Sequence, residues 1–427
     1  MRKIRVAAAL MCLLLLLSLL FGCKTEGGLK VRVPKTAALA LPKYQRETVE
    51  YTLPEEQRIP YREGLQPYLR TMIPALLADA GDGNTAASPL NIYMALALLA
   101  EITEITGGDS RAQLETLLGA ETEQLRDWAS DVWQNNYRQG DQNQVLMGGA
   151  LWLNETVEFK QKTLDLLADR YYAGSYRGEM GSSAFDTTFQ NWLNDHTGGL
   201  LTDQIGGLTL PEDTVLALST AVYYTGWWDR EFPAARTMEQ TFYAPCGEIK
   251  VPMMKMTDDL LYYWGDAFSA VCLRMDTGRM WFLLPNEGKT PADLLNGEQA
   301  LDLILNGNQW ENVKAAQVHL SIPKFDVSAQ KDVAQTLKTM GVQAVFDPAQ
   351  ADFSPVTDTR PVWACSVLHG TRVKIDEKGC EAASYTVIPA PGAAPPPDDE
   401  VDFTLDRPFL FCVTGPDGLP LFVGIVN

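Results

Sequence analysis

The spacing of the hydrophobic residues changes part-way along the chain, and this change limits the possible folds more than any other feature. Up to about residue 200, apolar side chains recur mostly at helical spacing, whereas later segments are short, apolar and rich in β-branched residues. A helix-rich part followed by a sheet-rich part is typical of the α+β class. The expected helices are 65–80, 90–100, 110–118, 125–137, 158–172 and 187–197.

The strand-like segments are expected to build most of the later part of the fold. Segment 215–224 is nearly all apolar or β-branched, so it predicts a central strand buried on both faces. The other expected strands are 145–153, 280–284, 318–325, 362–375 and 409–426, the last broken by a turn at 415–418.

The first residues have the pattern of a secretion signal. A basic start is followed by the apolar run 7–20, which is shorter than the roughly 20 residues that a membrane-spanning helix needs. Leu20-Phe21-Gly22-Cys23 resembles the cleavage box of bacterial lipoproteins, although Phe21 is bulkier than that box usually contains. We expect a signal peptide at 1–22, a lipid on Cys23, and a membrane-anchored protein on the outer cell surface. The alternative is an ordinary secretory signal with a cysteine nearby.

The segment after Cys23 is expected to be a tether. Residues 24–61 contain Gly27-Gly28 and scattered prolines, with no sustained helical or alternating period. The expected organisation is therefore a signal peptide at 1–22, a tether at 23–62 and one folded body at 63–427.

Charge excludes one class of partner. The chain has 35 Lys and Arg against 54 Asp and Glu, a net charge of −19. A surface this acidic repels phosphate and sulfate groups, so nucleic acids and heparin-like polyanions are poor partners.

Metal sites and disulfide bonds are also not expected. Three histidines cannot readily supply a multi-histidine metal site, and no C-x-x-C pair is present. Five cysteines remain after the signal peptide and Cys23 are set aside, which is an odd number with wide spacings. These cysteines are Cys246, Cys272, Cys365, Cys380 and Cys412.

No motif indicates an enzyme or a cofactor. The chain lacks a G-x-S-x-G elbow, a phosphate-binding P-loop and an H-E-x-x-H motif. Ser366 and His369 are three residues apart on an expected strand, so they would point to opposite faces. We therefore expect no catalytic residues.

Several motifs resemble the serpin family, in the family's order. Segment 403–413 fits the family signature at every position, and 374–383 resembles the hinge before the reactive loop. Segments 318–325 and 337–346 resemble a family strand and the helix after it. Segment 220–232 resembles the central strand and the breach, with Trp228 at the buried tryptophan position, and Ser88-Pro89 resembles the start of the second helix. The resemblance covers about 63–427.

The resemblance implies one α+β domain with about nine helices, three β-sheets and an exposed reactive-centre loop at about 379–402. It also implies a monomeric inhibitor that acts as a suicide substrate of serine proteases. A protease cleaves the loop, and the N-terminal side of the loop then inserts as a new strand into the main sheet. The alternative is a non-inhibitory serpin that acts as a surface binding or structural protein.

The hinge has the small side chains that insertion requires. Only every other residue of a strand enters the core, and a bulky or charged side chain there would be costly. Glu381 and Tyr385 fall on the outward side, opposite Cys380 and Ala382. The hinge residues that the resemblance assigns are Glu377, Gly379, Cys380, Ala382, Ala383 and Ser384.

A cluster at the point where the sheet opens departs from the family pattern. The resemblance assigns Ser88, Asn91, Thr220 and His369 to it. Asn91 stands where the family usually has serine, and Thr220 where it usually has asparagine. Either an amide and a hydroxyl have exchanged places with their hydrogen bonds retained, or the two substitutions are unrelated.

The expected scissile bond is Ala393–Ala394, in a proline-rich loop. Family spacing from Gly379 leads to Ala393, whereas counting back from Phe409 leads near Pro397. The bonds before Pro395, Pro396 and Pro397 are poor protease substrates. Gly392–Ala393 is the alternative. A small residue before the bond, and no Lys or Arg between 385 and 401, favour elastase-like proteases.

Overall fold

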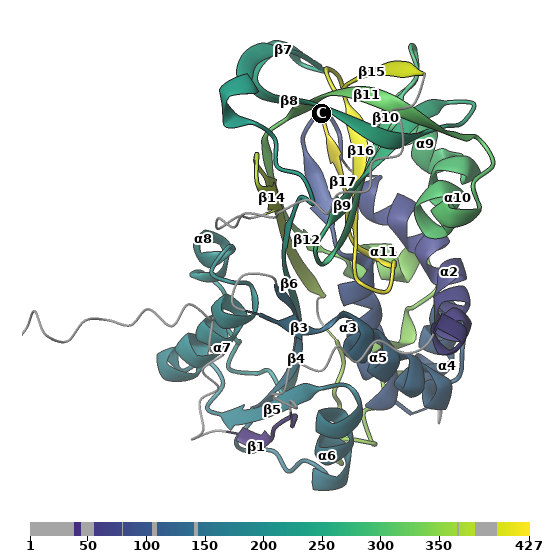
Figure 1. Ribbon diagram of the computed structural model, residues 1–427. Coiled ribbons are helices and arrows are strands. Elements are labelled where there is room, and N and C mark those ends of the chain that lie inside the picture. Colours follow the sequence, from purple (N-terminus) through teal and green to yellow (C-terminus); the bar gives the residue numbers. More distant parts are fainter. Residues whose placement is uncertain are drawn as a thin grey trace, which may run out of the picture.

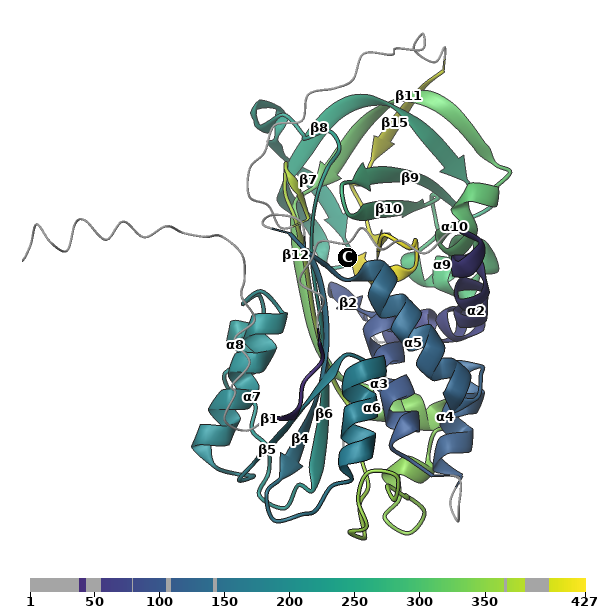
Figure 2. The same cartoon turned by 60° about the horizontal axis from the view of Figure 1, so that its bottom comes forward.

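A long β-sheet forms the middle layer of the molecule, with helices on both of its faces. The computed structural model describes residues 38–43, 55–78, 80–104, 109–140, 144–364, 367–380 and 399–427. Figure 2 shows α7 and α8 on one face of this sheet and α3, α5 and α6 on the other. A second, strongly curved sheet caps one end of the molecule, at the top of Figure 1.

Ten α-helices lie in the described part of the chain, and most begin close to where the sequence predicts. Ser88 caps α3, because its hydroxyl accepts a hydrogen bond from the Asn91 N–H at 3.3 Å, and Pro89 occupies the first turn. The helices are α2 (Glu55–Leu77), α3 (Pro89–Glu101), α4 (Ser110–Leu118), α5 (Thr122–Asn136), α6 (Gln161–Arg170), α7 (Ser183–His196), α8 (Thr202–Ile205), α9 (Pro291–Asn296), α10 (Glu298–Asn306) and α11 (Ala334–Thr339).

The main sheet has the strand order β1-β5-β4-β6-β14-β13-β12, and β3 pairs with β4 beside this path. Strand β4 runs antiparallel to β6 over ten residue pairs, and β12 runs antiparallel to β13 over eight. The strands are β1 (Ala38–Ala40), β3 (Arg138–Gln139), β4 (Gln144–Asn154), β5 (Ala173–Gly178), β6 (Leu216–Trp227), β12 (Phe325–Asp332), β13 (Leu368–Ile375) and β14 (Gly379–Cys380).

The described strands at the other end form one continuous network of hydrogen bonds, in the order β15-β11-β8-β9-β10-β16-β17-β2, with β7 on β8. The long strand β8 pairs with three neighbours, so the second and third expected sheets are joined through it. The strands are β2 (Thr85–Ala87), β7 (Met238–Ala244), β8 (Gly247–Trp264), β9 (Phe268–Met275), β10 (Gly278–Pro285), β11 (Val313–Pro323), β15 (Glu400–Thr404), β16 (Phe409–Thr414) and β17 (Pro420–Val426). The α+β class is confirmed.

The signature segment 403–413 lies in the core rather than at a binding surface. Phe409 and Phe411 are at most 1% exposed, and both pack against the ring of Phe325. Phe409 also contacts Phe282 on β10, so the motif joins the two sheets through a single aromatic cluster. The resemblance of this segment to the family signature therefore lies in residues that pack in the core.

Three expectations about local structure need correction. Segment 24–61 is not without regular structure, because β1 lies within it and α2 already begins at Glu55. The expected strand 362–375 begins only at Leu368. The first residues of β6, 216–220, are half-buried rather than buried on both faces, because the neighbouring strand β14 ends beside the other end of β6.

Candidate functional site

Among the described strands, the main sheet is open between β6 and β13. These two strands are joined only by the two residues of β14, which pair with Trp227 and Gly226 on β6 and with Ile375 on β13. No other register joins β6 to β13, and both strands lie fully within the described residues. Most of β6 therefore has a paired edge toward β4 and an edge toward β13 that no described strand covers.

Glycine at 379 is required by the close approach of β14 to β6. A Cβ atom at this position would lie 2.3 Å from the carbonyl oxygen of Gly226 and 2.8 Å from the Cα of Trp227. Gly226 itself has the Thr277 hydroxyl 2.5 Å from where its Cβ would be. Gly379 thus lets the start of the loop pair closely with β6, and Gly226 makes room for the Thr277 side chain beside it.

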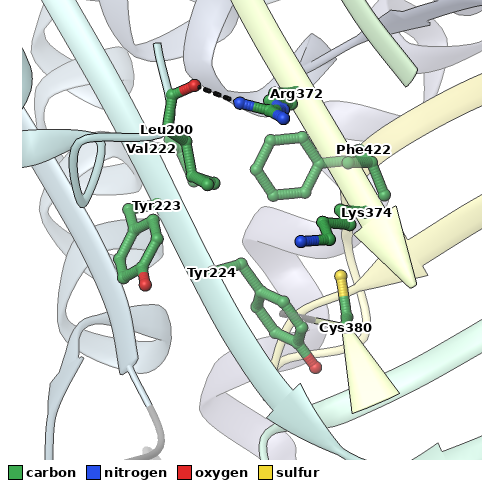
Figure 3. Close-up of a pocket in the computed structure, with 9 residues that line it drawn as sticks. Leu200, Val222, Tyr223, Tyr224, Arg372, Lys374, Cys380 and Phe422 are labelled. Carbon is green, nitrogen blue, oxygen red and sulfur yellow. Dashed lines mark hydrogen bonds between the residues drawn. The ribbon is translucent and has the colours of Figure 1, made fainter. Parts of the chain in front are cut away.

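The Cys380 side chain points inward from β14. It is 4% exposed and lines a small cavity of about 20 Å³ between β6 and β13. Figure 3 shows Tyr224, Lys374 and Cys380 at one end of this cavity and Leu200 and Arg372 at the other. The cavity begins at the last residue of β14 and lies along the line that a longer strand would follow.

Trp228 holds the chain just before β14. Its ring is 3% exposed, and its indole N–H donates to the carbonyl of Asp376 at 3.0 Å. The Trp228 backbone N–H donates to the carbonyl of Lys378 at 3.0 Å. These two bonds fix the turn between β13 and β14 against the end of β6.

Glu377 is the charged member of the hinge, and it is paired. Its carboxylate accepts from Lys324 Nζ at 2.8 Å and from the Thr237 hydroxyl at 2.9 Å. Burial alone would raise the pKa of this carboxyl, but the bonds from Lys324 and Thr237 hold it below its usual value. Lys324 and Thr237 were not predicted, because their distance from Glu377 in the sequence gives no signal of contact.

The structure brings Ser88 and His369 together under the opening. The Ser88 N–H donates to His369 Nε2 at 2.9 Å, and the Thr371 hydroxyl lies 2.7 Å from the same nitrogen. His369 is 5% exposed, and its burial, together with the nearby charge of Lys331, lowers its pKa to about 4. The ring is therefore neutral at pH 7 and accepts the Ser88 hydrogen bond.

Asn91 and Thr220 also meet, but through the backbone of Thr220. The Asn91 amide donates to the Thr220 carbonyl at 3.4 Å. This bond joins the start of α3 to β6. No bond between the Asn91 amide and the Thr220 hydroxyl is seen, so the contact does not depend on the side chain at 220.

Arg372 joins the strand on the far side of the opening to the segment between α7 and α8. Its guanidinium makes two bonds to Asp326, at 2.7 and 2.6 Å, and a third at 2.7 Å to the carbonyl of Leu200. Figure 3 shows this third bond at the edge of the cavity. A strand that entered here would have to displace the segment around Leu200.

Acid is expected to destabilise the protein through its buried histidine. The folded chain gives His369 a pKa of about 4, against 6.5 for an unperturbed histidine. As pH falls below about 6.5, His369 is protonated in the unfolded chain but stays neutral in the folded chain until about pH 4. The free energy of unfolding therefore falls across this pH range. At pH 4.5 the loss is about 2–3 kcal/mol for His369 alone.

Urea unfolding at pH 7 and pH 4.5 measures this loss. His369→Gln is expected to lose less stability on acidification than the native chain, whereas the control His319→Gln changes a partly exposed histidine and leaves His369 in place, so it keeps the loss due to His369. His196, which is also buried with a pKa of about 4, accounts for a remaining loss in both variants. Equal losses in the two variants would contradict the role given to His369.

Part of the predicted site lies outside the described residues. The lipidation residue, three hinge residues and the expected scissile pair belong to this group: Cys23, Ala382, Ala383, Ser384, Ala393 and Ala394. In the part of the chain that is described, no three His, Cys, Asp or Glu side chains gather into a group that could hold a metal ion. The helices within the same residues are all too short or too polar to span a membrane.

Comparison with known sequences gives relatives over most of the chain. A family model described as "Serpin (serine protease inhibitor)" matches residues 70–427. Serpin-Z2A of Triticum aestivum is 28% identical over 362 residues, which cover 81% of this chain and 90% of the relative. Alpha-1-antiproteinase of Callosciurus caniceps is 29% identical over 367 residues, 82% of this chain and 85% of the relative.

Solved structures show the same fold. The thermophilic serpin tengpin in its native state has a TM-score of 0.74 and 22% identity, covering 91% of this chain and 96% of that one. Thyroxine-binding globulin in complex with thyroxine has a TM-score of 0.71 and 20% identity, covering 84% and 98%. The family match, the fold and the paired hinge agree, and this chain belongs to the serpin family, whose members are generally inhibitors of proteases.

Proposed function

We propose that this protein inhibits serine proteases as a suicide substrate, by inserting its cleaved loop between β6 and β13. The observation that carries the proposal is the uncovered edge of β6 beside β14. An exposed row of backbone N–H and C=O groups is a template for an added strand. β14 is already the first two residues of such a strand.

The register of β14 defines what an inserted strand would contain. Cys380 pairs with Gly226 in the antiparallel sense, so continuing the ladder pairs residue 381 with 225 and residue 390 with 216, the first residue of β6. Every second residue then follows Cys380 into the core. These residues are Ala382, Ser384, Thr386, Ile388 and Ala390, and none of them is charged.

The outward positions accept the residues that would not fit inside. Glu381 and Tyr385 fall on the opposite face of the inserted strand from Cys380. Pro389 also falls there, and it lacks the N–H for a ladder hydrogen bond. A continuous ladder would therefore extend to Ile388, which pairs with residue 218, two residues short of the end of β6.

The scissile bond belongs to this proposal as Ala393–Ala394, three residues beyond the end of β6 in this register. A small residue before the bond fits a protease with a small specificity pocket. Incubation with an elastase-like protease is expected to give a covalent complex that survives boiling in detergent, together with a released fragment that begins at Ala394. Mass spectrometry of the fragment identifies its first residue.

Two variants test the position of the scissile bond separately from the choice of target protease. Ala393→Arg is expected to shift inhibition from the elastase-like protease to a trypsin-like one, because such enzymes need a basic residue before the bond. Val387→Arg is the matched control, which adds the same charge on the outward side of the inserted strand and away from the bond. Rapid trapping of trypsin by the native chain would contradict the specificity, and a fragment starting at Ala393 would favour Gly392–Ala393.

The rival function is a serpin that binds a ligand or partner without inhibiting proteases. Thyroxine-binding globulin, one of the structural neighbours, is seen in complex with thyroxine. Cleavage of the loop by several proteases, with no detergent-stable complex from any of them, would favour the rival.

The location is part of the same proposal. The lipoprotein-like box at Cys23 supports a protein held on the outer surface of a membrane. A diacyl or triacyl cysteine would anchor it stably, which a single acyl chain does not achieve. Radiolabelled fatty acid incorporated into the native chain, and not into Cys23→Ser, tests the anchor.

A further inference from the structure

The short strand β1 covers the outer edge of the main sheet. It runs antiparallel to β5, with Ala38 opposite Tyr176 and Ala40 opposite Ser175. The Gln161 amide at the start of α6 donates to the Leu39 carbonyl at 3.2 Å. Ala40 is 9% exposed and belongs to the main core, so the strand is packed as well as hydrogen-bonded.

Small side chains allow β1 to pack at this position on the edge of β5, which we call its seat. Ala38 packs against the aromatic cluster around Trp152 on one side of the sheet, and Ala40 packs into the core on the other. Leu39 and Leu41, by contrast, are 36% and 38% exposed. A large or charged side chain at Ala40 would have to leave the core, and β1 would leave with it.

β1 determines where the chain leaves the folded body. Fifteen residues separate Cys23 from Ala38, and fully extended they reach at most about 50 Å. Without β1 as a point of attachment, the next described element is α2, which begins at Glu55, 32 residues from Cys23, and a chain of that length extends to at most about 110 Å. A domain of this size is about 50 Å across, so only the seated strand limits which end of the body faces the anchor.

The seat lies far from the two described ends of the reactive loop. Figures 1 and 2 both show β1 beside β5 and α6 at the lower end, while β15, where the loop rejoins the body, is at the upper end with β7, β8 and β11. The other end of the loop is β14, which also lies well above β1 in both views. The exit of the tether and the return of the loop are thus at opposite ends of the molecule.

We propose that β1 orients the protein on its membrane: by holding Ala38–Ala40 on the edge of β5, it keeps the α6 end toward the lipid surface and presents the reactive loop outward. The inference rests on the lipid anchor of the proposed function. The partner of the α6 end is accordingly a lipid bilayer, and the loop end is left free for proteases in the surrounding medium.

An exposed cysteine near the loop end allows a direct measurement. Cys246, in the turn between β7 and β8, is exposed, whereas Cys380 and Cys412 are buried and burial raises the pKa of Cys272 to about 12. With Cys365→Ser introduced, a donor dye placed on Cys246 of the full lipidated chain reports its distance from acceptor dyes in the headgroups of phosphatidylcholine vesicles.

Energy transfer is expected to be low in the native chain and in the control Leu41→Glu, and to rise about twofold in Ala40→Glu, since a longer tether lets the loop end approach the bilayer. Hydrogen exchange of segment 38–41 shows whether β1 has been released. If segment 38–41 stays protected in Ala40→Glu, the energy-transfer measurement is repeated with the double variant Leu39→Pro, Ala40→Pro, which removes two backbone N–H groups from β1.

The proposal is overturned if transfer stays the same after β1 has been released, or if the native chain already shows high transfer. Failure of the underlying anchor is recognised separately. Intact mass would then show an unmodified Cys23 and the chain would not bind vesicles, while complex formation with a protease in solution would be unaffected.

Discussion

Replacing Cys380 with arginine is expected to convert the protein from a protease trap into a protease substrate. Cys380 is 4% exposed and lines a cavity of about 20 Å³, which cannot hold a guanidinium group. Lys374 lines the same cavity, so the new charge would also meet a like charge. A buried charge without a partner costs several kcal/mol, so residue 380 is expected to leave β14 in the variant, and returning it to the core becomes the costly first step of insertion.

The consequence is a change in the fate of the acyl-enzyme. If insertion slows while hydrolysis of the acyl-enzyme does not, each 1.4 kcal/mol added to the insertion barrier shifts the partition by about tenfold. We expect the number of inhibitor molecules consumed per protease trapped to rise at least tenfold. Titration of the protease, with densitometry of the detergent-stable complex, measures this number.

Two matched variants make the result specific to the inward position. Cys380→Ser keeps the size and should inhibit normally. Glu381→Arg carries the same new charge on the outward side of the inserted strand, and should also leave the stoichiometry near that of the native chain. If Cys380→Arg inhibited with unchanged stoichiometry, the inserted strand would not follow the register of β14.

Much of the fold could be predicted because its local signals agree with its packing. Ser110–Leu118 has the bounds that its apolar period predicts, and Gly119 after it adopts the left-handed conformation that ends such helices. Ser88-Pro89 likewise predicted the start of α3. Elements of this kind carry their own boundaries in a few adjacent residues.

The missed elements depend on distant contacts. β1 is three residues long, too short to show a period. It is held in place by pairing with β5 and by the hydrogen bond that the Gln161 amide donates to it. The spacing predicted α2 from residue 65 but missed its first part, 55–64; the helix contains prolines at 60, 67 and 74, so local propensity opposes a helix that tertiary packing nevertheless maintains. Neither β1 nor this first part of α2 could have been found from its own residues.

The candidate site likewise contains some residues that could be predicted from the sequence and others that could not. Gly379 and Cys380 could be identified because insertion demands small side chains and the hinge motif is contiguous. The ion pair of Glu377 with Lys324 and the bond of Arg372 to the Leu200 carbonyl join residues 53 and 172 positions apart. No pattern in a single sequence encodes such pairs, because the topology of the sheet alone brings them together.

Cleavage of the reactive loop is expected to raise the melting temperature by about 10 °C or more, since each kcal/mol of added stability shifts it by roughly 2 °C in a domain of this size. In the intact protein no described strand covers the edge of β6 that faces β13, and the Leu216–Thr220 part of β6 is half-buried. An inserted segment 381–388 would satisfy the backbone groups of that edge and bury Ile388, which alone contributes about 2 kcal/mol.

The same argument supplies the control. Insertion must displace the Leu200 segment that Arg372 holds, and it must keep residue 380 in the core, so Cys380→Arg should be cleaved without a comparable rise in melting temperature. Differential scanning calorimetry before and after complete cleavage compares the two chains. If the native chain melts at the same temperature before and after cleavage, the opening between β6 and β13 does not accept the loop, and the protein is a serpin that binds without trapping.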